Sequence, residues 1–104
     1  LYHFTWSCDD TGSEYYHVNY GTSEHLYGPV TYRYPILTKN KDKAMLGTGH
    51  HSILRKPGTD TYWIAYHRFV TPLTRFTEGK GYHREVCIDP LTFSNDGLIK
   101  QVQL

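Results

Sequence analysis

The first residues in this sequence that could do chemistry are two adjacent histidines in a glycine-rich run. His50 and His51 lie between Gly47 and Ser52. A neutral imidazole binds metal ions and forms hydrogen bonds with polar ligands. Adjacent residues of a strand point to opposite faces, so we expect the two rings to act separately, one facing a channel and the other an interface between sheets. Ordinary hydrogen bonding within the fold remains open as the alternative role for either ring.

A second set of candidates lies further along the chain, at His67, Arg68 and Arg84. His67 and Arg68 are neighbours in a strand-like segment, where their simplest role is to join neighbouring sheets by hydrogen bonds. Arg84 offers a rigid fork of donors, which suits the adjacent hydroxyl groups of a sugar or a carboxylate. A structural ion pair of Arg84 with Glu85 or with Asp89 explains this residue as well as a substrate contact does.

Three acidic residues near the start of the chain could be mistaken for an acid–base pair. Asp9, Asp10 and Glu14 are close in sequence. In an inverting glycosidase the two catalytic carboxyl groups lie about 6.5–9.5 Å apart. However, the stretch has the composition of a turn, where Asp accepts hydrogen bonds from nearby backbone N–H groups. We therefore predict that these residues form a turn.

The two cysteines and the remaining motifs exclude several chemistries. Cys8 and Cys87 are far apart in sequence and fit no metal-binding motif. We expect two buried thiols rather than a disulfide. The sequence has no His-x-x-x-His pattern on a helix, no paired Cys-x-x-Cys and no glycine-rich phosphate loop, so zinc and phosphate chemistry are unsupported.

Composition narrows the class of protein further. The chain has 104 residues, enough for one small domain, and its formal net charge of +1 comes without a basic block, which argues against a nucleic-acid partner. No apolar run approaches the roughly 18 to 20 residues that span a bilayer, so we expect no membrane partner. Ten tyrosines and two tryptophans suit partly buried strands, and their flat rings also suit sugar rings.

The elements that must position these residues are predicted to be strands, because no window shows the 3.6-residue apolar period of a helix. Turn residues and prolines divide the chain into strand-like segments, and Lys56 to Asp60 is predicted to form a turn. Pro35 to Leu46 is expected to connect two groups of strands, and Thr71 to Gly81 to form a long loop. The predicted strands are Tyr2 to Ser7, Tyr15 to Tyr20 (closed by Gly21), Val30 to Tyr34, His50 to Leu54, Tyr62 to Val70, Arg84 to Asp89 and Leu98 to Leu104.

The segment from Tyr62 to Val70 indicates how these strands are arranged. Both of its faces are largely apolar, with Ile64 and Tyr66 on one and Trp63 and Phe69 on the other. A strand that is apolar on both faces implies a sheet on each side. Four-stranded antiparallel sheets stacked around a channel, as in a β-propeller, meet this requirement better than a sandwich with one wet face.

We therefore predict an all-β fold that is part of a β-propeller, with about two blades of four-stranded antiparallel sheets. Residues 1–46 would form most of one blade and its connection, and residues 47–104 the last blade. The first blade is incomplete at its front, so we expect Leu1 to be a cut end. The strand from Leu98 is expected to be cut short at Leu104.

Several segments, taken in order, point to a known family. The segments are Phe4 to Ser7, Gly47 to Ser52, Tyr62 to Arg68, His83 to Asp89 and Asp96 to Lys100. This series resembles the C-terminal end of a five-bladed β-propeller of glycoside hydrolase family 43, the arabinanase, β-xylosidase and α-L-arabinofuranosidase group. The resemblance covers nearly the whole chain, and its individual motifs are only moderately specific.

The resemblance implies a parent enzyme that hydrolyses O-glycosidic bonds of plant cell-wall polysaccharide, such as arabinan, arabinoxylan or xylan, with inversion. It also implies that the catalytic carboxylates lie upstream of Leu1, so no catalytic residue is assigned here and the 104-residue chain alone is expected to be inactive. The chain would complete the propeller and form one wall of the sugar pocket. The missing N-terminal blades would be its partners, and the parent would be secreted or periplasmic.

Two residues of this chain match positions with a role in the family. Gly49 and His50 match a Gly-x-Gly-His segment whose histidine lines the central channel and helps to hold a calcium or similar ion, largely with water. The resemblance therefore implies His50 as a metal ligand and as a residue of the substrate channel. Some members place an arginine of the last blade at the edge of the sugar pocket, which implies Arg84 as a substrate-binding residue.

Two other readings of the sequence remain. The chain could be a non-catalytic propeller segment that binds carbohydrate on its aromatic faces, and the full-length protein would then bind sugar without hydrolysing it. It could also be an independent structural β-domain, which predicts a cooperative unfolding transition for these residues alone.

Overall fold

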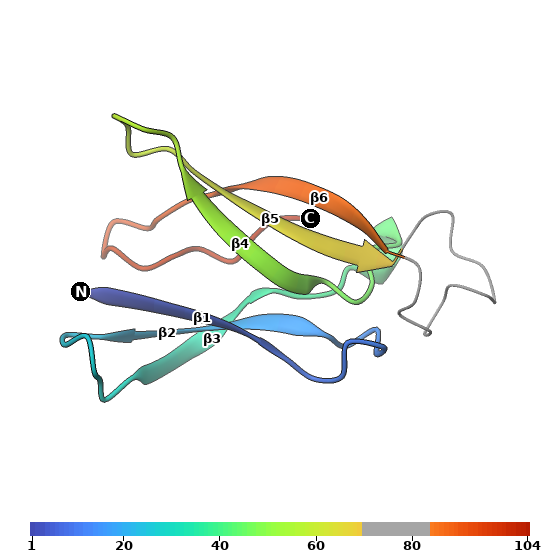
Figure 1. Cartoon of the computed structure of the whole chain (residues 1–104), viewed down its shortest axis with the longest axis horizontal. Helices are drawn as coiled ribbons and strands as arrows, with labels where there is room; N and C mark the ends of the chain where they lie inside the picture. Colours follow the sequence, from blue (N-terminus) through green and yellow to red (C-terminus); the bar gives the residue numbers. More distant parts are fainter. Residues whose placement is uncertain (70–83) are drawn as a thin grey trace.

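The chain folds into two layers, each a three-stranded antiparallel sheet (Figure 1). The computed structural model describes residues 1–69 and 84–104. Each sheet has its strands in sequence order, and the all-β prediction is confirmed. The first sheet contains β1 (Tyr2–Cys8), β2 (His17–Ser23) and β3 (Thr31–Leu37), and the second contains β4 (Gly49–Arg55), β5 (Tyr62–Phe69) and β6 (Arg84–Leu91).

The connections between strands follow the turn chemistry of the sequence. Asp9 has a positive φ of 80°, and its carboxylate accepts the N–H of Asp10 at 2.7 Å. The Asp10 carboxylate accepts the N–H of Gly12 at 2.8 Å, so both acidic residues form the turn between β1 and β2, as predicted. Between the sheets, the connection contains a single turn of 3-10 helix, η1 (Lys41–Lys43).

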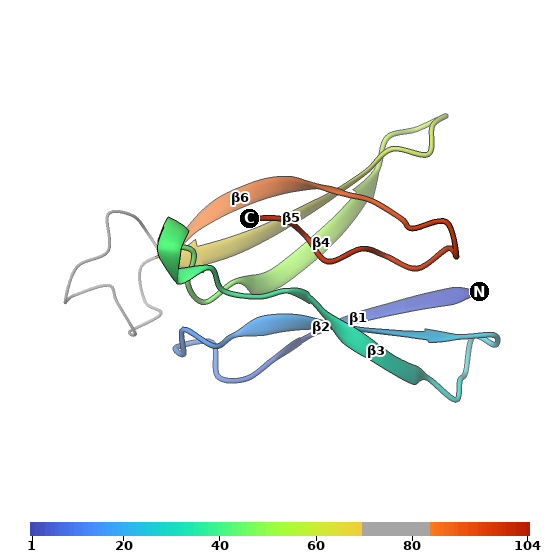
Figure 2. The ribbon, with the colours of Figure 1, turned by 180° about the vertical axis from the view of Figure 1, so that it is seen from behind.

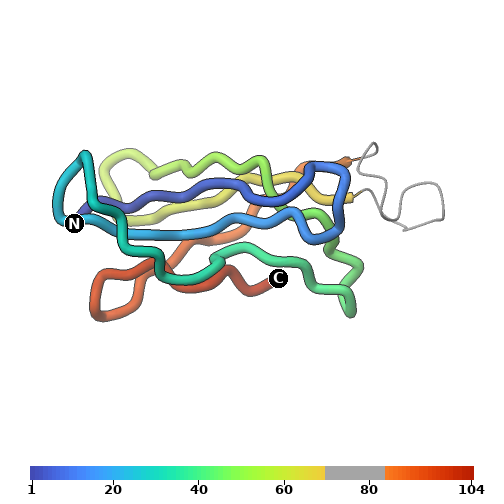
Figure 3. Tube along the Cα trace, turned by 90° about the horizontal axis from the view of Figure 1, so that it is seen from below, coloured from blue at the N-terminus to red at the C-terminus, as the bar shows by residue number. Residues whose placement is uncertain are grey.

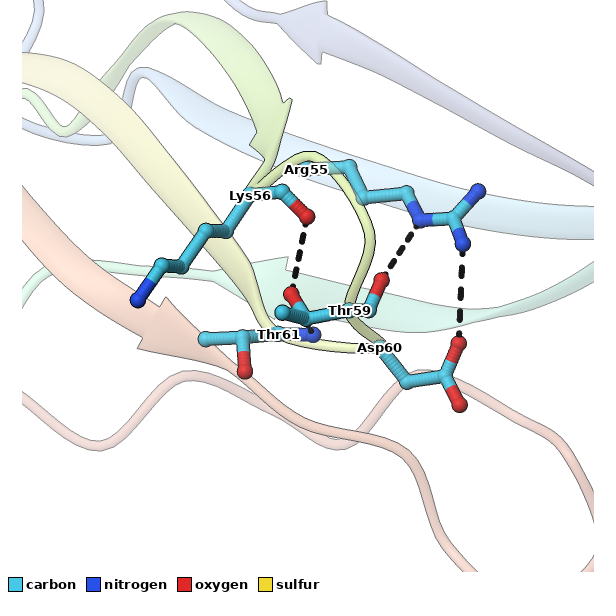
Figure 4. Close-up of polar contacts among 5 residues, drawn as sticks. All are labelled: Arg55, Lys56, Thr59, Asp60 and Thr61. Atoms are coloured by element: carbon cyan, nitrogen blue, oxygen red, sulfur yellow. Dashed lines mark hydrogen bonds and ion pairs between the residues drawn. The ribbon is translucent and has the colours of Figure 1, made fainter.

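The hairpin between β4 and β5 is closed by a compact set of polar contacts (Figure 4). The backbone oxygen of Thr59 accepts Nε of Arg55 at 2.7 Å, and the hydroxyl of Thr59 donates to the Lys56 carbonyl at 2.8 Å. Asp60 lies 3.8 Å from the same guanidinium, but this pair is exposed and contributes little. The predicted turn from Lys56 to Asp60 is confirmed.

Three strands differ from the sequence prediction, one at a glycine and two at prolines. Gly21 was expected to close a strand, but it lies inside β2 at a register shift. A side chain there would lie 2.7 Å from Val30, so glycine permits the close approach of β3 at this irregularity. β3 continues through Pro35, which an edge strand tolerates, and β6 likewise passes through Pro90 instead of ending at Asp89.

The core lies between the two sheets. Its largest fully buried side chains are Tyr20 of the first sheet and Tyr66 and Phe69 of the second. The Tyr66 hydroxyl donates to the Asp89 carboxylate at 2.5 Å, which satisfies the polar end of a buried ring. The cluster that joins the sheets contains Val18, Tyr20, Ile36, Leu37, Met45, Ile64, Tyr66, Leu91, Ile99 and Val102.

The C-terminal segment corrects the prediction of a fourth strand from Leu98 to Leu104. The segment crosses to the first sheet and runs beside β3 (Figures 2 and 3). Val102 donates its N–H to the carbonyl of Ile36 at 2.7 Å. The backbone of Ile99 is held by two tyrosines of the first sheet, since its carbonyl accepts the Tyr34 hydroxyl at 2.5 Å and its N–H donates to the Tyr20 hydroxyl at 3.2 Å.

Two other predictions concern the segment between β5 and β6. The loop predicted from Thr71 to Gly81 and the end of the strand predicted at Val70 lie outside the described residues. Within the described parts of the chain, no helix is long and apolar enough to cross a membrane.

The outer faces of both sheets are rich in exposed apolar side chains. On the first sheet, the rings of Trp6 and Tyr32 are tilted against each other with 6.4 Å between centroids, and 54% of Tyr32 is exposed. On the second sheet, Val86 is 75% exposed and Ile88 63%. The sequence predicted that both faces of β5 would be covered by other sheets. Within this chain only one face is covered, because Ile64 is fully buried and its neighbour Trp63, on the other face, is not.

The hydrogen bond between His3 and Tyr20 predicts a dependence of stability on pH. The Tyr20 hydroxyl lies 2.7 Å from Nδ1 of His3 and also accepts the N–H of Ile99 at 3.2 Å. Burial, and to a lesser extent the positive chain terminus, lower the pKa of His3 below its usual value of 6.5. Tyr20 on β2, Phe93, Asp60 and the terminal amine are the groups around it.

The unfolded chain therefore binds more protons than the folded chain as the pH falls below about 6.5. We expect the free energy of unfolding to decrease from pH 7 toward pH 5, and His3→Phe to reduce this slope because phenylalanine keeps the ring contacts without titrating. Urea unfolding at several pH values measures both slopes. Equal slopes for the two proteins would exclude His3 as a contributor.

Candidate functional site

The glycine run before His50 exists because aromatic rings occupy the space where side chains would be. Gly47 has a φ of 63°, and a side chain there would lie 2.4 Å from the ring of Phe69. A side chain on Gly49 would lie 2.5 Å from the ring of Tyr16. Backbone bonds fix the same segment, since Gly47 donates to the carbonyl of Glu14 at 2.9 Å. The run thus brings the start of β4 close to β5 and to the residues before β2.

His50 occupies an irregular position at the start of β4. Gly49 pairs with His67 and Ser52 pairs with Ala65, so β4 contains one more residue than β5 over this interval, as in a β-bulge. His50 has a φ of 52°, which few residues other than glycine adopt. Its side chain is exposed, and its backbone N–H donates to the hydroxyl of Ser7 at 3.1 Å.

The rings of His50 and His51 point to different surroundings, as predicted. Nε2 of His51 lies 2.7 Å from the hydroxyl of Thr5 on β1, so this ring joins the two sheets. Burial, followed by the charge of His50, lowers the pKa of His51. The ring of His50 instead stacks on His67, with 5.5 Å between ring centroids.

His67 lies between two rings. Tyr16 stacks on it at a centroid distance of 5.7 Å and an interplanar angle of 17°, and His50 stacks on it at an angle of 27°. Tyr16 is 6% exposed and belongs to the segment before β2, whereas His50 begins the other sheet. The three rings therefore join both sheets at the end where β4 begins and β5 ends.

Arg84 reaches the same place from β6. Its Nη1 donates to Nε2 of His67 over 3.2 Å, so the two sequence-predicted site residues, His50 and Arg84, meet at His67. The bond requires Nε2 to be the unprotonated nitrogen, which places the ring proton on Nδ1. Burial, followed by the charge of Arg84, lowers the pKa of His67, so the ring is neutral at neutral pH.

The two acidic residues considered as partners of Arg84 contact other side chains of this sheet. Glu85 forms an ion pair with Arg68 at 3.0 Å, and Asp89 accepts the hydroxyl of Tyr66. Arg68 also contacts the sulfur of Met45. Arg68 therefore has structural partners, as predicted.

The acidic residues near the start of the chain have structural partners as well. Glu14 forms an ion pair with Lys39 at 2.6 Å, and this bond lowers the pKa of the Glu14 carboxyl. The cysteines are both free and partly buried, so no disulfide joins them, although neither is as deeply buried as predicted. Burial raises the pKa of Cys87.

The calcium ion implied by the resemblance would need ligands beyond the described residues around His50. Calcium binds roughly six to eight oxygen ligands. Among residues 1–69 and 84–104, no three histidine, cysteine or acidic side chains come together as a metal site. His50 offers one nitrogen, and its ring already stacks on His67.

Two residues of this site, His67 and Tyr16, were not predicted to belong to it. His67 was expected only to join neighbouring sheets, and Tyr16 is one aromatic residue among many in the sequence. The available signal was the glycine at position 49, which indicated a close approach of backbone to some bulky group. That group is Tyr16, and the strand register places His67 opposite the same glycine.

Comparison with known proteins places these residues in a family. The model of glycosyl hydrolases family 43 matches residues 1–99. The chain is 28% identical over all of its 104 residues to the β-D-galactofuranosidase xynD of Aspergillus niger, of which it covers 29%. The chain therefore spans less than a third of the length of that curated relative.

Solved structures agree with this assignment. A thermostable family-43 glycoside hydrolase is 30% identical, with a TM-score of 0.80 over 99% of this chain and 31% of that protein. Another glycoside hydrolase is 26% identical, with a TM-score of 0.83 over 99% of this chain and 22% of that one. The prediction of an all-β fold that is part of a five-bladed β-propeller is confirmed, but the described sheets have three strands each and not the four that were predicted.

The glycine run gives a prediction with an internal control. Gly47 and Gly58 both have positive φ, at 63° and 75°, but only Gly47 has an aromatic ring where a side chain would be. We expect Gly47→Ala to destabilise the protein by about 1–3 kcal/mol more than Gly58→Ala, because only the first substitution overpacks the core. Urea unfolding measures the difference, and equal losses would show that Phe69 moves aside freely.

Proposed function

We propose a function on the premise that this chain belongs to family 43 of the glycosyl hydrolases: it is the closing part of the propeller of a glycosidase. The enzyme would hydrolyse O-glycosidic bonds of plant cell-wall polysaccharide, such as arabinan, arabinoxylan or xylan, with inversion. The observation that carries this proposal is the family match over residues 1–99, nearly the whole chain.

In this proposal the chain contributes a wall of the sugar pocket and not the acid–base pair. The described carboxylates of Glu14, Glu85 and Asp89 are engaged with Lys39, Arg68 and Tyr66. Asp9 and Asp10 form a turn. The carboxyl groups that the reaction requires would come from residues outside this chain, and the 104 residues alone would be inactive.

Arg84 is the residue that we assign to substrate contact. Its guanidinium is exposed and is directed by His67 at the end of the sheet where His50 also lies. Planar donors of this kind bind adjacent sugar hydroxyl groups, and a neutral histidine beside them adds no competing charge. We propose that His50 faces the channel at the same end. A calcium ion there would receive its oxygen ligands from water and from residues outside this chain.

The remaining blades of the same protein are the proposed partners of this chain. The exposed apolar faces that carry Trp6 and Tyr32 on one side and Val86 and Ile88 on the other would pack against them. An enzyme that acts on cell-wall polysaccharide meets its substrate outside the cytoplasm, so we propose that it is secreted or periplasmic.

One prediction of the proposed function concerns substrate binding by Arg84. In the enzyme that carries this chain, Arg84→Ala should lower kcat/KM about 10- to 100-fold on the best aryl glycoside, because a hydrogen bond from a charged group contributes about 1.5–3 kcal/mol. The panel contains the 4-nitrophenyl α-L-arabinofuranoside, β-D-xyloside and β-D-galactofuranoside, the last because of the name of the Aspergillus niger relative.

Arg55→Ala is the matched control, since Arg55 lies in the hairpin at the other end of β4 and should leave kcat/KM unchanged. Equal effects of the two substitutions would contradict the role of Arg84. Binding of saccharides without hydrolysis of any glycoside would favour a carbohydrate-binding propeller over an enzyme.

Another prediction of the proposed function concerns the 104-residue chain by itself. With both outer faces uncovered, we expect it to aggregate or to melt without a cooperative transition, and to release no 4-nitrophenol from any member of the panel. Differential scanning calorimetry and the same assay measure these outcomes. A sharp and reversible transition would contradict the proposal that other blades cover these faces.

A further inference from the structure

His67 connects all the residues that the proposed function places at the sugar pocket. It contacts His50 by ring stacking and Arg84 by a hydrogen bond of 3.2 Å. These residues belong to three different strands of the second sheet, β4, β5 and β6. His67 therefore links His50 and Arg84 across the sheet, with one contact to each.

The ring of His67 is itself held in place by parts of both sheets. Tyr16 covers one side of it at 5.7 Å and is 6% exposed, so this ring is fixed by the interface between the sheets. Gly49 lies opposite His67 in the strand register and leaves room for Tyr16, because a side chain there would lie 2.5 Å from that ring. The position of the imidazole is therefore set by packing, and not by Arg84.

The hydrogen bond to Arg84 has a definite direction. A guanidinium has only donors, so Nε2 of His67 must accept. A long arginine side chain loses several rotatable bonds of freedom when it binds a ligand, and a fixed acceptor removes part of that loss before the substrate arrives. The imidazole of His67, held by stacked rings, can orient the guanidinium of Arg84 in this way. A carboxylate in the same place would also orient it, but its negative charge would neutralise the charge that the guanidinium offers to the sugar.

We propose that His67 is a positioning residue that orients the guanidinium of Arg84 for the substrate, with Tyr16 and His50 fixing the plane of its ring. This inference rests on the proposed function of Arg84 and adds to it the residue through which the first sheet influences the sugar pocket. His67 itself touches no substrate in this account.

Two substitutions in the enzyme that carries this chain distinguish the role of His67 as a hydrogen-bond acceptor from its role as a stacked ring. His67→Phe keeps an aromatic ring for stacking but removes the acceptor. His67→Gln keeps a carbonyl oxygen near the position of Nε2 but removes the ring. We expect the phenylalanine variant to lose about tenfold or more in kcat/KM, mainly through KM, and the glutamine variant to retain most of kcat/KM with a lower melting temperature.

A double-mutant cycle with Arg84→Ala tests whether His67 acts through the arginine. We expect His67→Phe to have no further effect on kcat/KM once Arg84 is alanine. An equal loss in both backgrounds would overturn the proposal, and so would a phenylalanine variant within about twofold of wild type. His51→Phe is the matched control, because it removes a histidine of the same bulge that contacts Thr5 and should change the melting temperature but not KM.

A spectroscopic measurement keeps the proposal testable if a variant does not fold or if the enzyme proposal fails. Long-range proton–nitrogen NMR of the wild-type protein should show Nε2 of His67 as an unprotonated acceptor, with a signal that shifts in Arg84→Ala. A proton on Nε2 would overturn the proposal whatever the activity. Failure of the proposed function has its own signature, since wild type would then hydrolyse no glycoside while the NMR signals stay as expected.

Discussion

The structure depends on one constraint: each sheet is apolar on both faces, and only one face of each is covered by the other sheet. Tyr20, Ile64 and Tyr66 fill the shared interface, whereas Trp63, Val86 and Ile88 remain exposed on the outside. A surface of this kind is stable when a further sheet covers it. The chain spans less than a third of the length of its curated relative, so the blades proposed to cover these faces fit the size of that protein.

The same constraint places the candidate site at one end of the pair of sheets. Stacked blades present their strand ends to a common surface, and here the beginning of β4, the end of β5 and the beginning of β6 converge. Tyr16 enters this convergence from the first sheet and stacks on His67, which in turn contacts His50 and Arg84. The geometry of the proposed sugar pocket is in this way linked to the packing between the two sheets. The crossing C-terminal segment is joined to the first sheet through Ile99, whose backbone bonds to the hydroxyls of Tyr20 and Tyr34.

Much of this arrangement could be predicted from the sequence, because strands and turns depend on local chemistry. The Asp9–Asp10 turn, the hairpin after Arg55 and the separate surroundings of His50 and His51 all follow from residue type and spacing. The crossing of residues 98–104 could not be predicted, since a strand-like pattern does not say which sheet the strand joins. The stack at His67 was missed for a related reason: Tyr16 is 51 positions away in sequence, and only the folded interface brings the two rings together.

Hydrogen exchange tests the central claim, that the exposed edges and faces of these sheets are interfaces within a larger propeller. β1 is an edge strand in this chain, so only the amides that bond to β2 are paired. The measurement compares amide protection along β1 in the 104-residue chain and in the larger protein of which this chain is proposed to be a part. The account predicts that the unpaired amides of β1 become protected in the longer protein, as strongly as those of β2. Rapid exchange of these amides in both proteins would contradict it.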